Sequence, residues 1–157
     1  MQVARPRRDV TRATRDAFLA EVERRVGAAS RLVAFERTID RLIGWSQRRS
    51  SLVVRPAGDQ NTVSYALQGD GTVLWAAYPR KGDGAKVVVL PRRFRRLPQP
   101  SQDRLLTQLN AVDPRIQIPA RGTLQVPMAS LNTAEAIRAF EELLSMAEDT
   151  AKGSQPS

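Results

Sequence analysis

The hydrophobic pattern of this chain changes its period once, close to residue 50, and this change restricts the possible folds more than any other feature. Before it, apolar residues recur at three- and four-residue steps, as on one face of a helix. After it they alternate, as in half-buried strands, with Val63, Tyr65 and Leu67 on one side. Helices followed by consecutive strands are typical of an α+β domain with an antiparallel sheet.

Two helices are predicted before the change of period. Asp9 suits the N-cap of a helix over 10–26, and Gly27 is a natural stop after it. Ser30 suits the cap of a second helix, which ends near 45–49.

Four strands are predicted next, over 51–56, 62–68, 72–79 and 86–90. Gly-Asp-Gly turns at 69–71 and 82–84 join the later strands as short hairpins, so the four form an antiparallel meander. The fourth strand is apolar on both faces, which indicates a central or covered position.

The last third of the chain predicts two more helices and one short strand. A helix opens at 100 or 101 and ends at Asp113. A short edge strand lies near 124–126, and Asn132 with Glu135 forms a capping box for the C-terminal helix. The predicted fold is therefore α+β: two N-terminal helices, an antiparallel four-stranded meander, then a helix, a short edge strand and a C-terminal helix.

The chain length of 157 residues suits one domain. We expect a flexible basic arm over 1–8, a single α+β domain over 9–149 and a disordered tail over 150–157. The longest apolar run, 87–90, is far shorter than the ~20 residues that span a bilayer. The sequence therefore predicts no membrane partner and a cytoplasmic location.

The chain contains no Cys and no His. Disulfides and thiolate metal sites are excluded, and the commonest general base and metal ligand are missing. Asp70 and Asp83 occupy hairpin turns, where Asp is favoured for backbone reasons. The Gly-Asp-Gly turns precede no helix and so do not resemble phosphate-binding loops. We therefore predict no catalytic residue, no metal site and no cofactor.

Net charge is +9 and the pI is about 11.2, and 22 of the 25 basic residues are Arg. Residues 1–100 carry a net charge of +11, and residues 101–157 carry −2. A field of this sign attracts polyanions or acidic proteins.

Candidate binding residues come from the basic clusters, because the guanidinium fork matches phosphate geometry and also stacks on bases. The candidates are Arg7, Arg8, Arg48, Arg49, Arg80, Lys81, Arg92, Arg93, Arg95 and Arg96. The last four surround Phe94, and we expect Phe94 and Leu97 to anchor that loop. For any single arginine, a solvated surface charge is the simpler interpretation.

The sequence favours a non-enzymatic binding module that contacts DNA or RNA through arginine–phosphate interactions. One alternative is a protein–protein adaptor or regulator that binds an acidic partner protein, with a homo-oligomer also possible. A second alternative is a metal-dependent enzyme that uses carboxylates alone. The aromatic residues Trp45, Tyr65, Trp75 and Tyr78 are either stacking platforms or core residues, and the core is the better interpretation for Trp75.

Overall fold

The computed structural model describes residues 7–26, 29–90, 94–116 and 123–153. Within these ranges, four α-helices accompany a five-stranded sheet in which every neighbouring pair is antiparallel. The mixed α+β class and the antiparallel sheet are therefore confirmed. The sheet has one strand more than the four-stranded meander, because the expected edge strand joins the same sheet.

Strand order follows the chain, with all four partnerships between consecutive strands. The strands are β1 (Leu52–Arg55), β2 (Val63–Leu67), β3 (Val73–Arg80), β4 (Gly84–Val89) and β5 (Leu124–Pro127). After β4 the chain forms a short 3-10 helix, η1 (Phe94–Arg96), and then an α-helix. Strand β5 follows this helix and pairs with β4. A second 3-10 helix, η2 (Met128–Leu131), then leads into the last helix.

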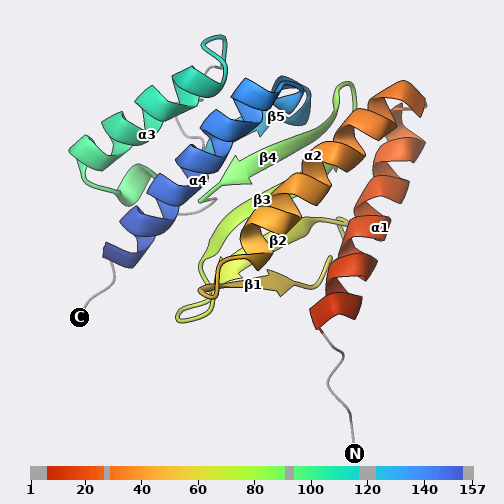
Figure 1. Ribbon diagram of the computed structural model, residues 1–157, viewed down its shortest axis with the longest axis horizontal. Helices are drawn as coiled ribbons and strands as arrows, with labels where there is room; N and C mark the ends of the chain where they lie inside the picture. Colours follow the sequence, from red (N-terminus) through yellow and green to blue (C-terminus); the bar gives the residue numbers. More distant parts are fainter. Residues whose placement is uncertain (1–6, 27–28, 91–93, 117–122, 154–157) are drawn as a thin grey trace, which may run out of the picture.

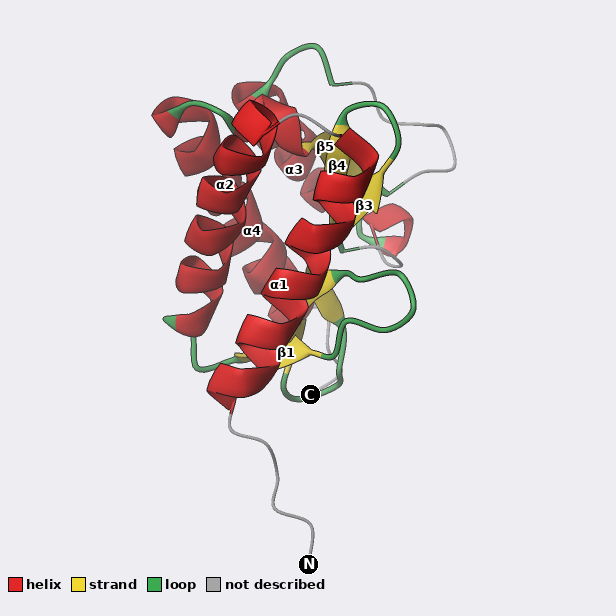
Figure 2. Ribbon diagram, turned by 90° about the vertical axis from the view of Figure 1, so that its right-hand side faces the viewer, coloured by secondary structure: helices red, strands yellow, loops and turns green. Residues whose placement is uncertain are grey.

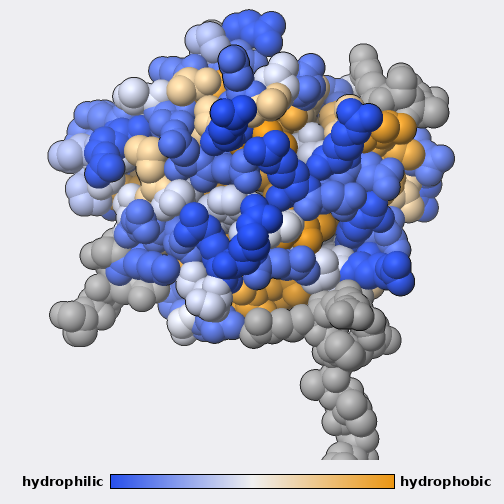
Figure 3. Space-filling model, in the orientation of Figure 1, coloured by the Kyte–Doolittle hydropathy of each residue, from blue (hydrophilic) through white to orange (hydrophobic). Residues whose placement is uncertain are grey.

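Helices α1 (Arg7–Val26), α2 (Ala29–Gln47) and α4 (Ala134–Gly153) cover one face of the sheet (Figures 1 and 2). Helix α3 (Gln99–Val112) packs beside α4 at the edge remote from α1 (Figure 1). The outer surface of this helical layer is mostly hydrophilic, with smaller apolar patches (Figure 3). In the described ranges, no helix combines the length and apolar composition needed to cross a bilayer.

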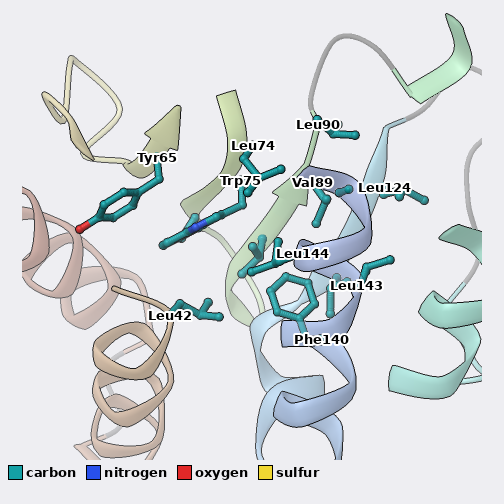
Figure 4. Close-up of a cluster of buried hydrophobic side chains, with 14 of the residues drawn as sticks. Leu42, Tyr65, Leu74, Trp75, Val89, Leu90, Leu124, Phe140, Leu143 and Leu144 are labelled. Atoms are coloured by element: carbon teal, nitrogen blue, oxygen red, sulfur yellow. The ribbon is translucent and has the colours of Figure 1, made fainter. Parts of the chain in front are cut away.

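The helix-covered face of the sheet carries the main core. Tyr65, Trp75, Val89 and Leu124 are partners along one row of four strands, and all four are buried. Figure 4 shows Tyr65, Trp75 and Val89 on the side of the sheet that faces Leu42 and the apolar residues of α4. The helical stripes that the sequence predicted therefore meet the alternating strand residues here.

Trp75 is a core residue, as its mid-strand position predicted. Its ring stacks on Tyr65 with centroids 5.5 Å apart, and Nε1 donates a 2.8 Å hydrogen bond to Oγ of Ser46. Burial raises the pKa of the Tyr65 hydroxyl. A buried indole N–H needs such a partner, because an unpaired donor costs about 1–3 kcal/mol.

The opposite face of the sheet is set by the same register. One row across it consists of Arg55, Ser64, Ala76, Val88 and Gln125, and the next row contains Tyr78, Lys86 and Pro127. Its small central residues are buried, whereas Tyr78, Lys86 and Gln125 are half-buried. Strand β4 is thus buried on both faces at Val87 to Val89, which confirms that it is covered.

Both predicted hairpin turns are present. Gly71 and Gly82 have φ values of 73° and 92°, in the region that favours glycine, and a side chain at either would meet open space. The carboxylate of Asp70 accepts a 2.9 Å hydrogen bond from the amide of Thr72. Asp70 and Asp83 therefore occupy turn positions, as expected.

Several predicted helix boundaries need correction. Helix α2 begins at Ala29, before the predicted cap at Ser30, and α3 begins at Gln99, one residue before the predicted range of starts. Helix α1 begins at Arg7, before the predicted cap at Asp9, and α4 runs to Gly153, beyond the predicted start of the tail at residue 150. The α4 cap is Thr133 in place of Asn132, because Thr133 Oγ1 accepts from the amide of Ala136 at 3.1 Å. Asn132 is instead the C-cap of η2, with φ −94° and ψ −2°, whereas the N-cap of a helix has non-helical dihedral angles. Residues 1–6 and 154–157 lie outside the described ranges.

Candidate functional site

The ten predicted site residues do not all lie within the described part of the chain. Arg92 and Arg93 are outside it. Arg7 and Arg8 open α1, but their side chains are also outside it. The geometry of a binding site therefore comes from the other six.

Arg95 and Arg96 lie on η1, and both are exposed. Phe94 and Leu97 are 1% and 8% exposed, so the expected anchoring of this loop is confirmed. Gln102 reinforces it by donating a 2.8 Å hydrogen bond to the carbonyl oxygen of Leu97. The Arg95 guanidinium carbon lies 5.4 Å from the Phe94 ring centroid.

Arg49 serves the fold, since its contacts are internal. Its Nη1 donates a 2.7 Å hydrogen bond to Oε1 of Glu148, and its guanidinium carbon lies 4.2 Å from the Trp45 ring centroid. The aromatic face and the carboxylate therefore hold Arg49 between α2 and α4. Its neighbour Arg48 is exposed.

Arg15, on α1, is also neutralised within the fold. Its guanidinium donates to Asp40 Oδ1 at 2.6 Å, to Glu36 Oε1 at 2.7 Å and to Asp16 Oδ1 at 3.0 Å. The hydrogen bond to Asp40 contributes most to raising the pKa of Arg15. This network links α1 to α2, so Arg15 is not available to a polyanion.

Arg80 and Lys81 lie at the β3–β4 hairpin. The Nε of Arg80 donates to Oδ1 of Asp83 at 2.6 Å, and Nη2 donates to Oδ2 of the same carboxylate. This hydrogen-bonded pair raises the pKa of Arg80. Lys81 is exposed at the tip of the hairpin.

Arg80 borders a cavity that no sequence motif indicated. We call it the Arg80–Arg115 pocket; its volume is about 440 Å³ and it is lined by Arg80, Asp113, Arg115, Ile116, Gln125, Pro127 and Ser130. The β3–β4 hairpin, the end of α3 and the start of α4 lie at this end of the molecule (Figure 1). The volume is within the range of small-molecule pockets, roughly 300–1,000 Å³.

Asp113 fixes one wall of the pocket. Its side chain is 9% exposed, and its Oδ1 accepts from the backbone amide and from Nε of Arg115, each at 3.0 Å. Oδ2 accepts from Nη2 of Arg115 and from the hydroxyl of Ser130, each at 3.1 Å. The hydrogen bonds from Arg115 hold the pKa of Asp113 at about 2, so the carboxylate is ionised at neutral pH.

Arg115 is held in place, although its side chain is 86% exposed. Asp113 uses its Nε and Nη2, just as Asp83 uses Nε and Nη2 of Arg80. Within the described residues, Nη1 of each guanidinium forms no hydrogen bond or ion pair. Each Nη1 carries two N–H donors, so each of these two lining arginines keeps one cationic edge without an internal partner.

Lys86 adds a third cation on the opposite face of the sheet. Its ammonium lies 5.9 Å from the Tyr78 ring centroid, and its register partner on β5 is the pocket residue Pro127. Tyr78, Lys86 and Arg80 share one face of the sheet, because Tyr78 pairs with Lys86 and Arg80 is two residues after Tyr78 on β3. This arrangement places an aromatic ring and a lysine next to the pocket.

The predicted basic clusters lie at different ends of the sheet. Arg80 is at the hairpin end of β4, whereas η1, with Arg95 and Arg96, follows its other end, roughly 17 Å away at about 3.3 Å per residue. Arg48 is at the C-terminal end of α2, away from the hairpin (Figure 1). The structure thus brings Arg80 and Arg115 to one pocket. Lys81 follows Arg80 in the hairpin, and Lys86 pairs with the pocket residue Pro127.

Sequence reasoning missed Arg115, Asp113 and Ser130. The Asp113–Pro114 step indicated only a helix end, and Ser130 lies in an unpredicted 3-10 helix. An Asp two residues before an Arg is the one local signal that was available. No group of three or more acidic residues close enough to hold a metal ion occurs in the described part of the chain.

Comparison of the chain with known proteins finds no matching family model, no matching curated protein and no matching solved structure.

Proposed function

We propose that this protein is a non-enzymatic module that binds nucleic acid through phosphate contacts. The contacts lie near the β3–β4 hairpin, on the sheet face opposite to helices α1, α2 and α4. The observation that supports it is the grouping of Arg80, Lys81, Lys86 and Arg115 around Tyr78 and one pocket. Arginine and lysine supply most phosphate contacts in such proteins, and an aromatic ring on a sheet can stack a base.

The charges at this end leave a positive excess. Asp83 and Asp113 each pair with one arginine, and Lys81 and Lys86 have no acidic partner within the described residues. The sum of these six groups is positive, so the surface attracts a phosphate backbone and releases its condensed counterions.

The alternative is a regulator that binds an acidic partner protein through the same cations. Planar stacking decides between the two, because a base uses the face of Tyr78 whereas a carboxylate-rich peptide does not. Tyr78 is half-buried on the sheet surface beside Lys86, which supports the nucleic-acid proposal.

The test is fluorescence anisotropy with labelled single-stranded and duplex DNA and RNA over a range of salt concentrations. We expect affinity to fall steeply with salt, and Lys86→Gln to lower the slope by about one unit. Arg37→Gln is the matched control. Arg37 is an exposed arginine on α2, so the substitution removes the same charge at a site away from the pocket. Failure to bind any nucleic acid at low salt, together with binding to poly-glutamate, would replace this proposal with the acidic-partner alternative.

A further inference from the structure

Asp113 and Arg115, in the Arg80–Arg115 pocket, are joined by more hydrogen bonds than the turn between them needs. A largely buried carboxylate, Asp113, forms three hydrogen bonds to one residue, Arg115, whose side chain is 86% exposed. An exposed arginine buries little apolar surface, so packing of the Arg115 side chain does not explain these contacts. What the contacts achieve is to fix the direction of a guanidinium that would otherwise sample many rotamers.

Both arginines of the pocket are held in the same way. In each, one aspartate occupies the Nε and Nη2 edge, and the two N–H groups of Nη1 are free within the described part of the chain. Because both arginines line one cavity, their Nη1 groups together carry four N–H donors that an oxyanion there could use. Pre-positioned donors of this kind bind more tightly because their ordering cost is already met.

We infer that the Arg80–Arg115 pocket binds a phosphate monoester. A monoester carries up to two negative charges and three terminal oxygens, whereas an internal phosphodiester carries one charge and two free oxygens. Two guanidinium edges therefore favour the monoester. The volume of about 440 Å³ accommodates the phosphate and the sugar attached to it, against the apolar walls of Ile116 and Pro127.

The phosphate monoester has two possible sources, a free nucleotide or the terminal phosphate of a nucleic acid. The second source rests on the proposed function, and the first does not. The experiment therefore uses three probes: a nucleoside 5′-monophosphate by calorimetry, and 5′-phosphorylated and 5′-hydroxyl forms of one oligonucleotide by anisotropy.

If the terminal phosphate is the ligand, the 5′-phosphorylated oligonucleotide binds about tenfold more tightly than the 5′-hydroxyl form, and Arg115→Gln removes the difference. If the free nucleotide is the ligand, only the monophosphate shows this dependence on Arg115. Equal binding of the two oligonucleotides with no binding of the monophosphate overturns the inference and leaves the proposed function intact. If no oligonucleotide binds, the proposed function fails and the monophosphate titration alone decides the pocket.

Asp113→Asn separates positioning from net charge. This variant makes the pocket more positive, so simple attraction predicts tighter binding of the monoester. A positioning role predicts weaker binding, because an amide offers Arg115 one neutral acceptor oxygen in place of the two carboxylate oxygens that now hold Nε and Nη2. Arg115→Lys, which keeps the charge but not the fork, is the second variant and is expected to bind as weakly as Arg115→Gln. Circular dichroism checks that each variant is folded, and retention of the phosphate preference by Arg115→Lys contradicts the inference.

Discussion

Nη1 of Arg49 donates a 2.7 Å hydrogen bond to Oε1 of Glu148, a residue 99 positions later whose side chain is 1% exposed. The hydroxyl of Ser51 donates to the other carboxylate oxygen, Oε2, at 2.5 Å. A carboxylate so deeply buried requires these donors. Arg49 therefore fastens the end of α2 to α4, although its sequence context indicated a surface cation.

Arg49→Gln is expected to lower the free energy of unfolding by about 1–3 kcal/mol, because a buried carboxylate loses a charged donor. Urea unfolding followed by circular dichroism measures the change. Arg48→Gln is the matched control on the neighbouring exposed arginine and is expected to be nearly neutral. Equal effects of the two substitutions would show that Arg49 has no structural role.

Ser46→Ala is expected to destabilise the protein by about 1–3 kcal/mol. It leaves the indole N–H of Trp75 buried without its 2.8 Å acceptor. Thr107→Ala is a suitable control, since Thr107 is exposed and its hydroxyl donates only to Asp103 in its own helix. Urea unfolding followed by tryptophan fluorescence measures both, and an unchanged midpoint for Ser46→Ala would contradict the prediction.

Phe94→Ala is expected to lower the free energy of unfolding by about 3–5 kcal/mol, because it empties the fully buried site that the Phe94 ring of η1 fills. Urea unfolding followed by circular dichroism measures the change.

Changing Arg95 and Arg96 together to Gln is expected to leave stability nearly unchanged, since both side chains are exposed. It is also expected to weaken nucleic-acid binding no more than the double variant Arg37→Gln with Arg104→Gln. A larger loss would return the binding site to this loop, where the sequence first placed it.

Stability at acid pH depends on Asp113. Its pKa is lowered from 3.8 to about 2 by hydrogen bonds from the Arg115 side chain and backbone. Since the folded pKa lies below the unfolded one, the contribution is complete above pH 3.8 and is lost as pH falls through about 2. The stability advantage of wild type over Asp113→Asn, measured by urea unfolding from pH 7 to pH 2, should therefore shrink between these pH values. An advantage that stays constant down to pH 2 would show that the ion pair does not stabilise the fold.

Apolar stripes on helices, alternation in strands and glycines at turns are local properties, and each could be predicted from the sequence. The change of period near residue 50, the turns at Gly71 and Gly82 and the anchoring of η1 by Phe94 and Leu97 all agree with the structure. The cap of α4 was placed one residue too early, because η2 is a short element without a periodic signal. The candidate pocket was not predicted, since Arg80 lies on β3, Arg115 in the turn after α3 and Ser130 on η2.

The sequence by itself determined the class of fold and the excess of positive charge, because periodicity and composition act over a few residues at a time. Only the tertiary structure decided which cations are available. Arg49 was a predicted binding residue, yet helix packing brings Glu148 against it from a distant position. Packing likewise brings Asp40 against Arg15. Arg115 looked isolated, yet the pairing of β5 with β4 brings it and Arg80 to the lining of one open pocket. The reason is that charge pairing depends on separations of a few ångströms, which are fixed by long-range packing and carry no local pattern.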